Sequence, residues 1–80
     1  DDVGEMLLVR LQQRMGTLTP RELDVARGLL QGQGSADLAA ALGLGTESVR
    51  TYRKRLYRRV GVSGQREFMA LLLQASAAWP

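Results

Sequence analysis

The chain of 80 residues carries a net charge of +3, from eleven basic and eight acidic side chains, and contains neither cysteine nor histidine. One small domain held by apolar packing is expected, because disulfides are excluded and the scattered carboxylates form no cluster for a metal ion. No enzyme and no cofactor are expected, since the common pairs of nucleophile and base use histidine or cysteine.

Apolar residues at helical spacing predict a first helix over residues 3–15. Its main ridge is expected to carry Val3, Leu7, Leu11 and Met15, with Met6 and Leu8 beside it. Gly16 suits the left-handed residue that often follows a helix end. We interpret residues 1–17 as an N-terminal linker helix with no chemistry of its own, and residues 18–80 as the main domain.

The second helix, predicted over about residues 20–31, has the most clearly marked start in the chain. Thr19 offers an N-cap hydroxyl, Pro20 suits the first helical position, and Glu22 can return a hydrogen bond to the cap. Glu22 could instead pair with a basic residue of a later helix, although capping is the favoured role. Gly28 either weakens this helix or marks a close crossing with another one.

Two further helices are predicted in the middle of the chain, joined by a compact glycine turn. The first covers residues 35–42 and the second residues 46–60, with Ser35 and Thr46 as their expected caps. Gly61 suits the end of the second helix. A helix, a tight turn and another helix form the arrangement by which helix-turn-helix proteins bind DNA.

The helix over residues 46–60 concentrates the positive charge of the chain. Six of the eleven basic residues fall within residues 50–59, and no acid interrupts residues 48–65. One side of this helix is expected to carry Arg50, Thr51, Lys54, Arg55 and Arg58, and the opposite side Val49, Leu56 and Val60. A solvated face, the alternative, normally mixes charges of both signs, so the pattern favours contact with a polyanion such as the major groove of DNA.

The final helix, predicted over residues 65–77, is apolar around much of its circumference. Its large apolar residues are Phe68, Met69, Leu71, Leu72 and Leu73. Three small neighbouring helices cannot cover all of this surface, which leaves deep burial or contact with a partner subunit as explanations. No strand pattern occurs, so we predict an all-α, four-helix helix-turn-helix domain preceded by the linker helix.

Several blocks of the sequence follow the order and spacing of one known family. They are Leu18-Thr19-Pro20-Arg21-Glu22, residues 32–39, Leu42-Gly43-Leu44, residues 48–52 and residues 59–62. From residue 18 onward the chain resembles the LuxR-type (GerE-like) helix-turn-helix family. The resemblance implies a bacterial transcription regulator that binds double-stranded DNA as a homodimer, usually attached to an upstream sensing domain, with RNA polymerase as a further partner.

The resemblance also implies roles for individual residues. Those expected to reach base edges are Arg50, Thr51 and Lys54. The resemblance implies phosphate contacts for Ser48, Tyr52 and Arg59, and we expect Thr46, Arg55 and Arg58 of the same helix to contact phosphates as well. The residues expected at the dimer interface are Phe68, Leu71, Leu72 and Leu73. The chain departs from the family pattern at Tyr52, where histidine is common, at Ala36, where lysine is frequent, and at Gln65, where arginine is usual.

Two other classes of partner are weighed against DNA. A basic amphipathic module for a protein or a membrane surface would need large apolar residues beside its cations, and Val49, Leu56 and Val60 are too few. RNA is disfavoured because its A-form major groove is too narrow for a helix. The longest apolar run, residues 68–73, is far shorter than the roughly 20 residues that span a bilayer, and a cytoplasmic setting without a membrane partner is predicted.

Overall fold

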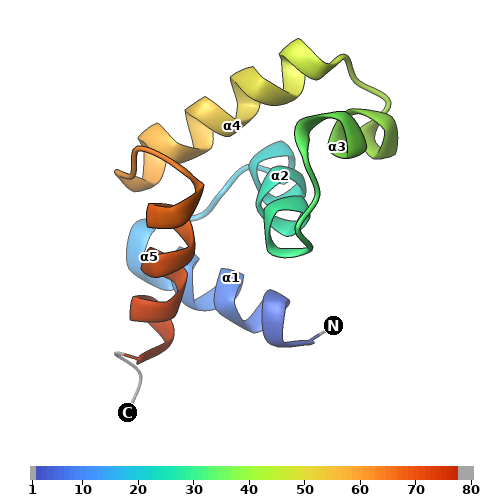
Figure 1. Cartoon of the computed structure of the whole chain (residues 1–80). Helices are drawn as coiled ribbons and strands as arrows, with labels where there is room; N and C mark the ends of the chain where they lie inside the picture. The colour runs from blue at the N-terminus through green and yellow to red at the C-terminus, as the bar shows by residue number, and fades with distance from the viewer. Residues whose placement is uncertain (1, 78–80) are drawn as a thin grey trace.

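Five α-helices and no strand make up the part of the chain that the computed structural model describes, residues 2–77 (Figure 1). In chain order they are α1 (Asp2–Met15), α2 (Pro20–Leu30), α3 (Ser35–Leu42), α4 (Thr46–Val60) and α5 (Gln65–Ala77). The all-α prediction is confirmed, and the predicted ends of each helix lie at most one residue from the observed ends.

The starts of α3 and α4 differ from the prediction. Gly34 and Gly45 are the N-cap residues, and neither helix has a hydrogen bond from a capping side chain. Ser35 and Thr46 are therefore wrong as caps. The extended backbone that an N-cap requires falls on the glycine in each case, which places the following hydroxyl already inside the first helical turn.

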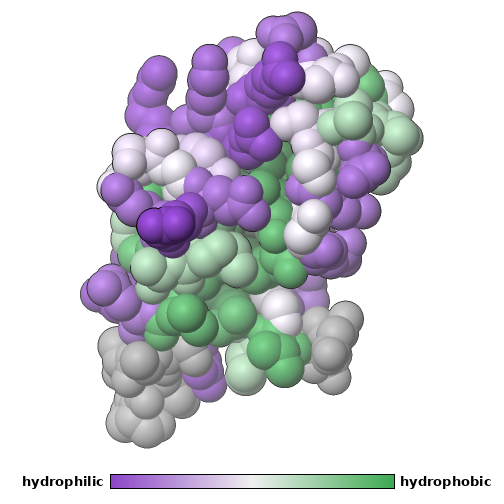
Figure 2. Space-filling model, viewed as in Figure 1, coloured by the Kyte–Doolittle hydropathy of each residue, from purple (hydrophilic) through white to green (hydrophobic). Residues whose placement is uncertain are grey.

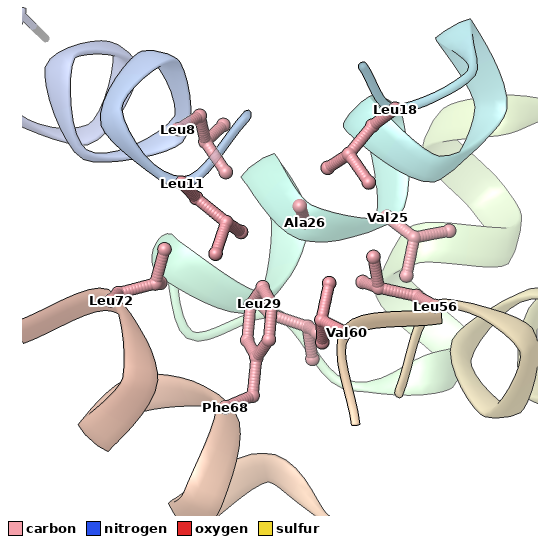
Figure 3. Packing of buried hydrophobic residues seen from close by; sticks show 10 residues of the cluster. All are labelled: Leu8, Leu11, Leu18, Val25, Ala26, Leu29, Leu56, Val60, Phe68 and Leu72. Atoms are coloured by element: carbon pink, nitrogen blue, oxygen red, sulfur yellow. The ribbon is translucent and has the colours of Figure 1, made fainter. Parts of the chain in front are cut away.

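The main core lies where α1, α2, α4 and α5 meet (Figure 3). Its buried residues are Leu8, Leu11, Leu18, Val25, Ala26, Leu29, Leu56, Val60, Phe68 and Leu72. A smaller cluster of Leu38, Ala39 and Val49 joins α3 to α4. The predicted inner side of α4 is confirmed, because all three of its apolar residues are buried in these two clusters.

Helix α1 packs along α5 and supplies part of the main core. Leu8 and Leu11 are buried, whereas Val3, Met6 and Met15 are exposed. Of the predicted ridge, Leu11 is buried and Leu7 packs against the core, whereas its two ends, Val3 and Met15, are exposed. The buried side of α1 is turned toward Leu8, because that is the side that α5 covers.

Gly28 marks a close crossing between α2 and α3. A Cβ atom at this position would overlap the side chain of Leu38. The helix nevertheless continues without interruption to Leu30. Of the two interpretations of this glycine, the close crossing is confirmed.

Candidate nucleic-acid interface

Helix α4 lies along one edge of the molecule, with one side in the core and the other in solvent (Figure 1). The outer face of α4 consists of five exposed residues, Arg50, Thr51, Lys54, Arg55 and Arg58. Figure 2 shows hydrophilic side chains standing out from this edge of the molecule. Because its apolar residues are buried, α4 presents a polar surface to a partner and has no apolar side for a membrane.

The three residues predicted to reach base edges lie together on this outer face, and two of them contact Glu47. Nη1 of Arg50 donates to Oε1 of Glu47 at 2.8 Å. The hydroxyl of Thr51 donates to the backbone oxygen of Glu47 at 3.1 Å. Glu47 is absent from the predicted site, although an acid three residues before an arginine on a helix is a signal for such a pair.

A shallow hollow of about 270 Å³ opens beside the first half of α4. Its lining residues are Glu47, Ser48, Thr51, Tyr52 and Arg55. Three residues predicted to hold phosphates, Ser48, Tyr52 and Arg55, are thus brought together next to a predicted base contact, Thr51. The hollow is small and open, so it suits a group at the surface of a larger partner rather than an enclosed small ligand.

Tyr52 lies close to two guanidinium groups. Cζ of Arg21, from the first turn of α2, is 5.8 Å from the centre of the tyrosine ring, and Cζ of Arg55 is 5.9 Å from it. Both distances fall within the range of cation–π contacts. Arg21, which also pairs with Asp24 at 3.5 Å, is not among the predicted site residues. Its place directly after the proline that begins α2 is the sequence signal that could have found it.

Arg59, which is predicted to contact phosphate, already contacts two other residues of the domain. Its Nη2 donates to the Thr17 carbonyl oxygen at 2.7 Å, and its Nε lies 3.4 Å from Oε1 of Glu22. That carboxylate oxygen also accepts the backbone N–H of Thr19 at 2.8 Å, as part of the capping box of α2. Glu22 therefore fills both of the roles that the sequence leaves as alternatives.

The other predicted phosphate contacts lie at the two ends of α4. Thr46 is partly exposed in the first turn, and Arg58 is exposed in the last turn. At 1.5 Å per residue, these positions are about 18 Å apart along the helix axis. Polar side chains are thus distributed along the whole length of α4.

Tyr57 belongs with the core and not with the outer face. Burial raises the pKa of its phenol. Its ring packs against Phe68, with 5.9 Å between ring centres. The phenol is therefore protonated at neutral pH, and the half-buried ring packs against the core rather than standing on the outer face of α4.

The surface of α5 offers less to a partner subunit than the sequence suggests. Phe68 and Leu72 are buried, Leu71 is half-buried against the core, and only Leu73 among the four predicted interface residues is largely exposed, at 65%. Phe68 and Leu72 are therefore corrected from interface to core residues. The reason is the packing of α1 along α5, which covers the apolar surface that three helices could not.

Two kinds of site are missing from residues 2–77. No group of three or more acidic, cysteine or histidine side chains in this part of the chain could hold a metal ion. Among the same residues, no helix is long and apolar enough to cross a membrane.

Comparison with known proteins identifies bacterial transcription regulators as similar to this chain. The family described as bacterial regulatory proteins, luxR family, matches residues 16–72. A protein of Aeromonas salmonicida described as an HTH-type transcriptional regulator is 43% identical over 56 residues, which is 70% of this chain and 29% of the relative. The transcriptional regulatory protein UhpA of Escherichia coli is 41% identical over 54 residues, 68% of this chain and 28% of the relative.

A third relative, the transcriptional regulatory protein MctR of Rhizobium johnstonii, is 30% identical over 54 residues, covering 68% of this chain and 25% of the relative. The chain thus spans less than a third of the length of the relatives it matches. No solved structure matches the chain at a significant level.

Proposed function

This chain belongs to the luxR family of bacterial regulatory proteins, whose helix-turn-helix domains bind DNA in transcription regulation, and on that premise we propose that α4 is its recognition helix. In this proposal α4 enters the major groove of double-stranded DNA with its outer face toward the bases. Arg50, Thr51 and Lys54 read base edges, the role that their shared position on that face supports.

The observation that carries the proposal is that one side of α4 is buried and the opposite side is exposed. Three buried residues, Val49, Leu56 and Val60, fix the helix against α2 and α3, and the opposite side carries exposed cations. A rigidly held cationic helix on an edge of a small domain suits the groove of a polyanion. A helix that only keeps the domain in solution would not need this concentration of one sign of charge.

Phosphate contacts are assigned to the residues around this face. They are Thr46, Ser48, Tyr52, Arg55, Arg58 and Arg59, to which the geometry adds Arg21. Of these, Arg59 would contact DNA only with the part of its guanidinium that Thr17 and Glu22 leave accessible.

The relatives are more than twice as long as this chain, which supports its being the output domain of a larger protein. We infer that residues 1–17 connect it to an upstream sensing domain. We further propose that it works in the cytoplasm as a homodimer built around Leu73 of α5, and that RNA polymerase is a partner of the bound dimer.

The test is a titration of a labelled duplex at increasing salt, read by fluorescence anisotropy. Each phosphate contact contributes about −0.9 to the slope of log affinity against log salt. With about four to six contacts per subunit, the affinity for DNA should fall by orders of magnitude between low and moderately high salt. Arg58→Ala should reduce the slope by about 1. Arg14→Ala, which removes an exposed arginine of α1, is the charge-matched control and should leave the slope unchanged. A flat titration would contradict the proposed function.

A further inference from the structure

Glu47 is the one carboxylate on the side of α4 that faces the proposed partner, among the residues that the structure describes. It is the second residue of α4, and its side chain is 87% exposed. Positions i, i+3, i+4 and i+7 of a helix share one side. Glu47 therefore begins the same row that continues through Arg50, Thr51 and Lys54.

Helix stability does not account well for an acid at this position. A carboxylate in the first turn interacts favourably with the helix dipole, but this effect and an exposed ion pair are both small. On a surface that binds phosphates, a carboxylate is repelled unless it receives hydrogen bonds in the complex. Binding of DNA by α4 would thus bring repulsion at Glu47, which the pair with Arg50 offsets in part and a donor on the DNA would offset further.

The base edges of the major groove offer few such donors. Amino groups are presented there by cytosine, through N4, and by adenine, through N6. Adenine also places its N7 acceptor beside that amino group, which disfavours a carboxylate with two acceptor oxygens. Cytosine has no acceptor beside its amino group on this edge and is the preferred base for glutamate.

The pair with Arg50 is compatible with this contact. The ion pair uses Nη1 of Arg50 and Oε1 of Glu47. Arginine has five donors, so others remain for a guanine, and the carboxylate keeps a second oxygen and further lone pairs for a cytosine. Arg50 and Glu47 could therefore read neighbouring bases while holding each other in place.

Resting on the proposed role of α4 as recognition helix, we propose that Glu47 is a specificity-determining residue that accepts a hydrogen bond from a cytosine amino group, next to the base that Arg50 contacts. In the alternative, Glu47 only orients Arg50 and touches no base. The two differ in what its removal does to the selected site.

The first experiment is selection of bound duplexes from a random pool, with the unchanged chain, Glu47→Ala, Glu47→Gln and Arg50→Ala. We expect Glu47→Ala to lose the preference for cytosine at one position that Arg50→Ala retains. Glu47→Gln should move that position toward adenine, since glutamine pairs with adenine N6 and N7. Glu5→Gln, which removes one negative charge from α1 at the far end of the molecule from the start of α4 (Figure 1), is the control and should select the original site.

The second experiment removes the amino group instead of the carboxylate. The selected cytosine is replaced by a pyrimidinone nucleotide that lacks the 4-amino group, and affinities are measured for both duplexes with the unchanged chain and with Glu47→Ala. We expect the replacement to weaken binding by the unchanged chain about tenfold and binding by Glu47→Ala hardly at all. Any effect of the weaker base pair is common to both proteins and cancels.

The outcomes separate the two proposals. If Glu47→Ala and Arg50→Ala relax the same single position, or if the amino group affects both proteins equally, Glu47 is not a reader of cytosine and this inference is overturned. If the unchanged chain selects no motif at all, the sequence-specific function itself fails. Circular dichroism of each variant confirms that the helices are retained.

Discussion

Arg59 and Thr17 lie 42 positions apart in the sequence and are joined by a hydrogen bond of 2.7 Å. The bond ties the last turn of α4 to the connection between α1 and α2, and the contact with Glu22 reinforces it at 3.4 Å. The C-terminal end of the proposed recognition helix is therefore fixed by a polar contact as well as by the core.

Replacing Arg59 should consequently affect the fold as well as DNA binding. We expect Arg59→Ala to lower the free energy of unfolding by about 0.5–1.5 kcal/mol, the usual net contribution of one hydrogen bond. Arg58→Ala, one residue earlier and exposed, should weaken DNA binding with little change in stability. Urea denaturation checks the first effect, and a duplex titration the second. Equal stability of the two variants would mean that the Thr17 contact contributes nothing in solution.

The residues on the outer face of α4 should divide into those that contact bases and those that contact phosphates. Arg50→Ala and Lys54→Ala should lower affinity for the preferred site more than for random duplex, because a lost base contact costs about 1–3 kcal/mol of discrimination. Arg58→Ala should weaken both about equally. The measurement is the ratio of specific to random affinity at one salt concentration. A similar ratio for all three variants would refute this division of roles.

The close crossing at Gly28 predicts opposite outcomes for two similar substitutions. Gly28→Ala places a methyl group into the Leu38 side chain and should destabilise the domain by about 1–3 kcal/mol, despite the higher helix propensity of alanine. Gly4→Ala is the control, because its Cβ would meet Leu30 at an ordinary 3.7 Å. It should stabilise α1 by up to about 1 kcal/mol. Thermal melts of both variants check the sign of each effect.

Leu73 is the residue of α5 on which the proposed dimer depends. Leu73→Glu should abolish cooperative binding to a duplex with two half-sites and leave the chain helical, because the side chain is 65% exposed. Leu72→Glu buries a charge in the core and should unfold the domain. Gel-shift titrations and circular dichroism distinguish these results. Cooperative binding that survives Leu73→Glu would place the dimer contact elsewhere, for example on the exposed side of α1 around Val3 and Met6.

Glu67 predicts a dependence of stability on acid pH. Hydrogen bonds from the backbone N–H and the hydroxyl of Ser63 lower the pKa of its carboxyl in the folded state. A lowered folded pKa means that the stabilisation is complete above the unfolded pKa, near 4.5, and is lost as the pH falls through the folded value. The difference in melting temperature between the unchanged chain and Glu67→Gln should therefore shrink below pH 4.5. A constant difference would contradict the assignment.

Much of the fold could be predicted because it depends on local patterns. Helical spacing identified the inner side of α4, including Val49, and turn-forming glycines identified the helix ends. The buried side of α1 could not be predicted, because spacing shows which residues share a side but not which neighbouring helix covers it. Leu8 is consequently expected only beside the main ridge, although it is buried.

In the candidate site, too, contacts within one helix could be predicted from the sequence, whereas contacts between helices could not. The exposed row around Arg50 follows from helical geometry alone, and the Glu47 pair, three residues away, was within reach of the same reasoning. The contact of Arg59 with Thr17 was not, because it depends on how α1, α2 and α4 are placed in three dimensions. Cation–π packing of Arg21 on Tyr52 is a second contact of this kind.

Helix α1 ends at Met15, before the match to the family begins at residue 16, yet Leu8 and Leu11 are part of the same core as Phe68 and Leu72. The cooperative unit of unfolding is therefore larger than the segment that defines the family. A fragment that begins at residue 18 would expose this apolar side of α5 to water, and we expect it to melt earlier and to self-associate through that newly uncovered surface. Oligomers of so short a fragment would result from the absence of α1 and would not represent the assembly that forms on DNA.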